Sequence, residues 1–222
     1  MSLFTEIRTI SSKKTRSSSQ AATERVHSER VDYWISLKEV DALNLVFLEE
    51  TGILLGDNRA YARSALGTRV GELKPFYRGA KITLVGAITQ DQVLALMTLD
   101  GSLDGAAFQV FIDHFLLPKL WHGAVVVMDK LAVHKMASVV TKIEAVGGSL
   151  VYLSAYSPDF GPIELWWSQL KLNLRSFAPT TSAMIDIILA AALDLINPQH
   201  LRNWESSLLL LYINTALRAV ID

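Results

Sequence analysis

Three acidic side chains, far apart in the sequence, stand next to apolar runs that are typical of buried elements. Glu49 ends the run 43–49, Asp129 follows the run 124–128, and Glu164 opens a helical segment. Carboxylates gathered at the ends of buried strands repel one another unless a divalent cation neutralises them, and oxygen ligands favour Mg²⁺ or Mn²⁺. Two such ions, about 3.5–4 Å apart, activate an attacking hydroxyl and stabilise the leaving oxygen in phosphoryl transfer. The three acids predict such a site wherever the fold brings them together.

Each acid also has an ordinary explanation. Glu49 on its own fits a solvated residue at the end of a strand, and Glu164 fits an acid that favours a helix N-terminus. Asp129 is harder to explain in this way, because it directly follows the fully apolar Ala-Val-Val-Val-Met. The metal site therefore depends on the elements that position the three acids.

Periodicity and turn residues predict a mixed α/β order of elements. The polar residues 89–92 are the right length for a hairpin turn, so the strands on either side of them should pair antiparallel. We expect a ribonuclease-H-like α/β fold, whose five-stranded mixed sheet has three antiparallel and two parallel strands and is flanked by helices, with extra C-terminal helices. If the first and fourth strands are parallel neighbours, Glu49 and Asp129 share one edge of the sheet. The expected strands are 43–49, 81–88, 93–99, 124–128 and 149–153, and the expected helices are 21–37, 105–117, 135–146, 163–176, 180–196 and 198–218.

Length and composition indicate one domain. The chain has 222 residues, half of them hydrophobic, and its 21 basic residues nearly balance its 22 acidic ones, so net charge neither requires nor excludes a nucleic-acid partner. The absence of cysteine excludes disulfides, a thiol nucleophile and cysteine-bound metals. No signal peptide is expected, because the N-terminus lacks a cationic stretch followed by an apolar one, and no membrane span is expected, because the apolar run 208–213 is too short. We expect a cytoplasmic protein. We divide the chain into a flexible basic lead-in (1–20), a catalytic domain (21–200) and a C-terminal helix of unknown role (201–222).

Two long motifs resemble those of known transposases. Residues 151–171 contain Tyr-Ser-Pro-Asp-Phe-Gly-Pro-Ile-Glu-Leu-Trp-Trp-Ser-Gln-Leu-Lys, which is similar to the signature of insertion-sequence transposases in the mariner superfamily (insertion sequence 630 type). Residues 125–135 resemble the segment of that family that holds its second acid, and 164 − 129 = 35 leaves the family's gap of 34 residues between the acids. Phe-Leu-Glu-Glu-Thr-Gly at 47–52 resembles the segment of the first acid. The resemblance covers about residues 40–200.

The resemblance implies a DDE-type catalytic domain in which Glu49, Asp129 and Glu164 are the catalytic acids and the ligands of two Mg²⁺ or Mn²⁺ ions. Its substrate would be DNA, cleaved and re-joined by in-line displacement. The chain departs from the family at several positions: Glu replaces Asp at 49, Lys130 replaces Asn, and Gly161 replaces Asn before Pro-Ile-Glu. The longer side chain at 49 displaces its carboxylate, and a displacement of about 1 Å lowers catalytic rates on the order of a hundredfold.

Basic residues indicate where DNA would lie. Six of them crowd 59–81 against a single acid, Glu72, which suits contacts to a phosphate backbone but also a solvated loop. We expect His134 to have a structural role rather than to act as a ligand or proton shuttle. The predicted DNA-contacting residues are Arg59, Arg63, Arg69, Arg78, Lys130 and Lys171.

Two alternatives to an active transposase remain. The chain is a non-catalytic remnant that binds DNA or self-associates, or it is a ribonuclease-H-like nuclease acting on other nucleic acids. Residues 1–40 leave no room for the helix-turn-helix by which family members recognise their element ends. We therefore expect either a homodimer or a partner polypeptide that carries the helix-turn-helix, acting on element ends and target DNA.

Overall fold

The computed structural model describes residues 23–57, 79–154 and 161–203. Their centre is a five-stranded sheet in the order β3-β2-β1-β4-β5. The first three strands pair antiparallel, and β4 and β5 join parallel to β1. This arrangement confirms the predicted ribonuclease-H-like sheet. The strands are β1 (Leu45–Leu54), β2 (Lys81–Ile88), β3 (Val93–Asp100), β4 (Val125–Met128) and β5 (Ser149–Tyr152).

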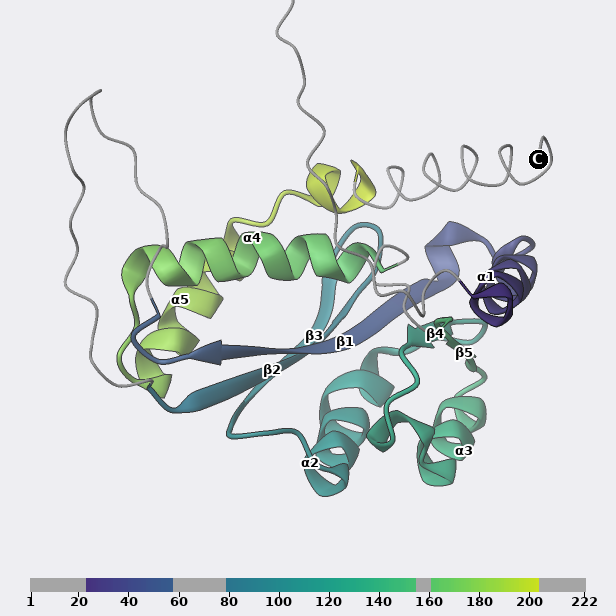
Figure 1. The fold of residues 1–222 in the computed structure, drawn as a ribbon, viewed down its shortest axis with the longest axis horizontal. Helices are drawn as coiled ribbons and strands as arrows, with labels where there is room; N and C mark the ends of the chain where they lie inside the picture. The colour runs from purple at the N-terminus through teal and green to yellow at the C-terminus, as the bar shows by residue number, and fades with distance from the viewer. Residues whose placement is uncertain (1–22, 58–78, 155–160, 204–222) are drawn as a thin grey trace, which may run out of the picture.

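Helices cover both faces of the sheet, and Figure 1 shows α4 and α5 on one side and α2 and α3 on the other. The layer under α4 and α5 contains Phe47, Ile82 and the tryptophans of α4. The opposite layer contains Val46, Leu48 and the apolar side chains of α2 and α3. Alternate residues of β1 therefore point to different layers, as the period of a strand requires. The helices are α1 (Glu24–Leu37), α2 (Gly105–Val110), α3 (Ala137–Ala145), α4 (Pro162–Phe177) and α5 (Ser182–Asp194).

The amphipathic helix α4 fixes one side of the future site. Pro162, which lacks the N–H that a first turn leaves unpaired, starts the helix, and Trp166, Trp167 and Leu170 are buried against the sheet. Gly86 of β2 makes this close approach possible, because a Cβ there would lie 2.8 Å from Cη2 of Trp167 and 2.9 Å from Cζ3 of Trp166.

Several predicted boundaries need correction. The helix expected at 105–117 is α-helical only to Val110 and continues as a π-helical stretch and a 3₁₀ turn to Lys119. The helix expected from residue 135 begins at Ala137, after a separate 3₁₀ turn at Val133–Lys135. The first strand extends to Leu54, five residues beyond the predicted end, because β2 pairs with it along that whole length.

The terminal predictions fall largely outside the described residues. The lead-in 1–20 lies outside them altogether, and the expected last helix is described only as far as residue 203. Within the described residues, no helix is both long and apolar enough to cross a membrane.

Candidate active site

Strand register places Glu49 and Asp129 next to each other. Phe47 of β1 pairs in parallel with Val127 of β4, and each acid lies two residues farther along its own strand. Parallel neighbours are separated by about 4.8 Å, so two residues at equivalent positions share one edge of the sheet. The structure therefore brings these two predicted acids together where β4 ends beside the middle of β1, so the sequence expectation that Glu49 ends its strand is wrong while its pairing with Asp129 holds.

Glu49 points to the layer of α4. Its partner across β1 and β2 is Gly86, the residue covered by the Trp166 and Trp167 rings, so the Glu49 side chain emerges beside two indoles. Its Oε2 atom is buried and accepts no hydrogen bond among the described residues. Burial raises the pKa of the Glu49 carboxyl to about 8, and a hydrogen-bonding contact and like charge from Glu164, with further like charge from Asp129, raise it too.

Glu164 reaches the same place from α4. It lies in the first turn of the helix and its residue is exposed, whereas the adjacent Ile163 is buried in the core. The contact between the Glu49 and Glu164 carboxyls joins the middle of β1 to the first turn of α4. Both other predicted acids thus act on Glu49, although the three come from separate parts of the fold.

Asp129 is held differently. Its Oδ1 accepts a hydrogen bond from the backbone N–H of Leu131 at 3.0 Å and lies 2.5 Å from Nδ1 of His134. Burial alone would raise the pKa of Asp129, but these two hydrogen bonds and the nearby positive charge outweigh it and lower the pKa. Asp129 is therefore ionised under conditions in which Glu49 still holds a proton.

The acids meet in pairs rather than in a closed ring of ligands. In the parts of the chain that the structure describes, no three His, Cys, Asp or Glu side chains are already gathered around one point that could hold a metal ion. The pairwise contacts of Glu49 are nevertheless present.

Sequence reasoning missed the role of Glu50 and undervalued His134. The imidazole is completely buried, with Asp129 at Nδ1 and Oε2 of Glu50 3.3 Å from Nε2. Burial alone would lower the pKa of His134, but its contacts with both carboxylates raise it to about 9. A usable signal existed: Glu50 follows Glu49 on a strand, so the two acids must face opposite layers.

The predicted DNA-contacting residues divide into two groups. Lys130 directly follows Asp129, and its Nζ lies 3.4 Å from Oε2 of Glu29 on α1, an exposed ion pair. Lys171 lies on α4, seven residues and about two turns beyond Glu164, on the same side of the helix. The other four, Arg59, Arg63, Arg69 and Arg78, lie outside the described residues.

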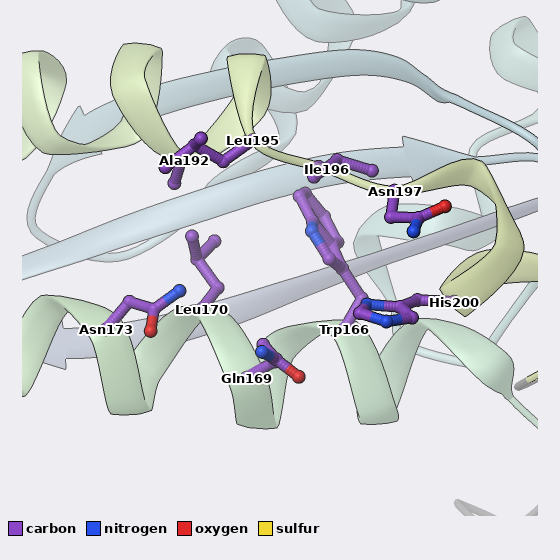
Figure 2. Close-up of a pocket in the computed structure, with 9 residues that line it drawn as sticks. All are labelled: Trp166, Gln169, Leu170, Asn173, Ala192, Leu195, Ile196, Asn197 and His200. Atoms are coloured by element: carbon purple, nitrogen blue, oxygen red, sulfur yellow. The ribbon is translucent and has the colours of Figure 1, made fainter.

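A separate cavity of about 190 Å³ lies between α4 and the chain that follows α5. Figure 2 shows the Trp166 indole reaching from α4 toward Ile196, with Asn197 and His200 at one end of the cavity. None of the three acids is among its lining residues. The cavity is therefore distinct from the place where the carboxyls meet.

Comparisons with known proteins agree with this geometry. Residues 44–185 match the model of a family described as DDE superfamily endonuclease, and this range contains all three acids. No curated protein sequence matches significantly.

Solved structures of Mos1 transposase share the fold. A Mos1 paired-end complex with the left transposon end superposes with a TM-score of 0.73 at 15% identity, covering 90% of this chain and 64% of that one. The isolated catalytic domain of Mos1 mariner transposase superposes with a TM-score of 0.62 at 13% identity, covering 87% and 91%. A Mos1 paired-end complex with Mn gives 0.69 at 16% identity. The chain spans less than two thirds of the Mos1 chain in the paired-end complexes, and about nine tenths of the isolated domain.

Proposed function

The chain belongs to the DDE superfamily endonuclease family, and from this premise we propose that it is a transposase catalytic domain. Its reaction would be metal-dependent cleavage and joining of DNA strands during movement of an insertion sequence of the mariner superfamily (insertion sequence 630 type). One observation carries the proposal: the Glu49 and Glu164 carboxyls meet beside Asp129 although they come from a strand, a helix and a second strand.

The residues present suit hard divalent cations. Glu49 has a buried carboxylate oxygen with no hydrogen-bond donor among the described residues, and its two carboxylate neighbours add negative charge. Carboxylate oxygens are the ligands that Mg²⁺ and Mn²⁺ favour, so Glu49, Asp129 and Glu164 would hold two such ions. When bound, the ions would supply Lewis-acid stabilisation of the charge that develops on a transferring phosphate.

The protein's own side chains prepare this site in two ways. The indoles beside Glu49 exclude water from one side of it, which strengthens every charge interaction there. Lys130, just after β4, and Lys171, on α4, flank the acids and would contact backbone phosphates of DNA. Arg59, Arg63, Arg69 and Arg78 would extend the same contact surface. No covalent enzyme intermediate is required, because in-line attack by a hydroxyl transfers the phosphate directly.

The proposal includes a partner. The Mos1 chains in the paired-end complexes are longer than this one and are held with transposon ends. We infer that this domain acts on element ends and target DNA, either as a homodimer or together with a polypeptide that carries a helix-turn-helix.

The test is a strand-nicking and strand-joining assay on duplex DNA with Mg²⁺ or Mn²⁺. The parent chain should nick and join DNA, Asp129→Ala should abolish both, and Asp194→Asn, an exposed acid at the end of α5, should leave both unchanged. Nicking by Asp129→Ala at the parental rate would overturn the proposal. The same assay on an RNA–DNA hybrid tests the rival nuclease, which would cleave the hybrid in preference to duplex DNA.

A second candidate, a DNA-binding remnant without catalysis, is favoured by two observations. Glu stands at position 49 and the described acids do not form a closed set of metal ligands. Glu49→Asp separates the two candidates, because shortening this side chain restores the family's ligand and would raise activity by on the order of a hundredfold if the extra methylene is the defect. Retained DNA binding with no nicking in the parent, Glu49→Asp and Asp129→Ala alike would establish the remnant.

A further inference from the structure

The buried imidazole of His134 joins Glu50 to Asp129, and its contact with Glu50 lies on the opposite side of β1 from the Glu49–Glu164 contact. Strand β1 contributes one acid to each side, since Leu48 belongs to the layer of α2 and α3 and Glu50 lies two residues beyond it. His134 meets Glu50 there, and its ring packs against Phe108 of α2 with centroids 4.7 Å apart. An acid outside the proposed catalytic set thus contacts the residue that holds Asp129.

The contacts of Asp129 fix the direction of its carboxylate. Oδ1 takes both hydrogen bonds, one from Leu131 and one from His134, whereas Oδ2 receives none from the described residues. A carboxylate oxygen has two lone pairs, so Oδ1 is fully used. The Asp129 side chain is 37% exposed, and the residue begins the loop after β4. These two hydrogen bonds therefore fix its orientation in place of close packing.

His134 is itself immobilised at every point. Its side chain has no exposed surface. Its backbone N–H donates a hydrogen bond to the carbonyl of Leu131, and its backbone carbonyl accepts one from the Tyr152 hydroxyl at 3.0 Å. Both ring nitrogens face carboxylate oxygens: Nδ1 donates a hydrogen bond to Asp129, and Nε2 lies in charge contact with Oε2 of Glu50 at 3.3 Å, without a hydrogen bond between them. The ring therefore cannot turn without breaking its contact with Asp129 or with Glu50.

We propose that His134 is a positioning residue: anchored by Glu50 through Nε2, it holds Oδ1 of Asp129 through Nδ1 and so presents Oδ2 to the carboxyl cluster. This inference deepens the proposed function and rests on it. Partners that orient metal ligands in this way change metal affinity by roughly 10–100-fold when they are removed.

Two isosteric substitutions separate positioning from packing. The amide nitrogen of Asn lies as many bonds from Cα as Nδ1 of histidine, and that of Gln as many as Nε2. His134→Asn therefore keeps the donor to Asp129, His134→Gln keeps only the contact with Glu50, and His134→Phe removes both. His114→Asn is the matched control, because His114 is exposed on the turn after α2.

The experiment measures Mn²⁺ affinity of the full chain by electron paramagnetic resonance, thermal stability, and the orientation of Asp129 in crystals of each variant without metal. We expect the Mn²⁺ affinity of His134→Asn to stay within about threefold of that of the parent. His134→Gln and His134→Phe should bind Mn²⁺ at least tenfold more weakly than the parent. We also expect Asp129 to keep its orientation in His134→Asn alone among the His134 variants. Rescue by Asn but not by Gln supports positioning, even if all three variants lose equal thermal stability.

Two results would overturn the inference. Asn and Gln variants that weaken Mn²⁺ binding equally, in step with their loss of stability, would make His134 a packing residue while leaving the proposed function intact. An unchanged Asp129 orientation in His134→Phe would overturn it as well. A parent chain that binds no Mn²⁺ contradicts the proposed function instead, and the crystals then decide the positioning of Asp129 on their own.

Discussion

Replacing Glu49 with glutamine should change how stability depends on pH. The carboxyl has a pKa of about 8 in the folded chain against an ordinary value of 4.5, so the folded state holds its proton more tightly than the unfolded state does. The contribution of the Glu49 carboxyl to the free energy of unfolding is therefore fully present below pH 4.5 and is lost as the pH rises through 8. Glutamine is neutral throughout and removes the decline.

The magnitude follows from linkage. Each pH unit between the two pKa values is worth about 1.4 kcal/mol, and partial solvent access with a proton shared between Glu49 and Glu164 reduces the total to roughly 2–4 kcal/mol. His134 also titrates between its ordinary 6.5 and about 9. The stability that His134 contributes is fully present below pH 6.5 and is lost as the pH rises through 9. The parent and Glu49→Gln share this contribution, so the difference between their stabilities reports on Glu49 alone.

The assay is urea unfolding from pH 4 to 9 in EDTA, followed by fluorescence. Parent and Glu49→Gln should be about equally stable near pH 4, and Glu49→Gln should be the more stable at pH 9. Saturating Mn²⁺ should reverse the order at pH 9, because the parent alone offers the ion a third carboxylate. Parallel stability curves, or a variant that is less stable at pH 9 in EDTA, would refute the reasoning.

Three further predictions concern neighbouring features. Gly86→Ala should destabilise the fold by about 1–3 kcal/mol, measured by urea unfolding, because its Cβ would collide with both indoles. Gly105→Ala is the control and should cost little stability, because its Cβ meets only the flexible Met136 side chain at 3.3 Å. Equal losses of stability in the two variants would contradict the packing of α4 on Gly86. Asp129→Asn should lower the pKa of His134 from about 9, because burial then meets less opposing charge, and a ¹H NMR titration of the imidazole that shows no change would refute the pairing. Lys130→Ala should cost at most about 1 kcal/mol of stability and reduce the salt dependence of DNA affinity by about one ion; an unchanged salt slope would exclude a phosphate contact.

The sheet was predictable because its strands carry strong local signals. The apolar, β-branched run before Asp129 and the polar turn at 89–92 specify a buried strand and a hairpin with little help from tertiary contacts. The extension of β1 to Leu54 was not predictable in this way, because Glu50 and Gly52 have weak strand propensity and pair because β2 lies alongside.

The site was predictable in part. Position after each strand indicated Glu49 and Asp129, and the register of β1 and β4 now explains why they are neighbours. The anchoring of Asp129 was not predictable, because it depends on a 3₁₀ turn that returns His134 to the strand end and on the face of β1 that Glu50 occupies. Such contacts depend on three elements packing together, and no single segment encodes them.

The most direct test of the central claim is a crystal of the chain soaked in Mn²⁺, with anomalous difference density measured where β4 ends beside Glu49 of β1. The account predicts density within coordination distance of Glu49, Asp129 and Glu164, and its loss from crystals of Asp129→Ala. Anomalous density elsewhere on the molecule, with none among these three carboxylates, would contradict it.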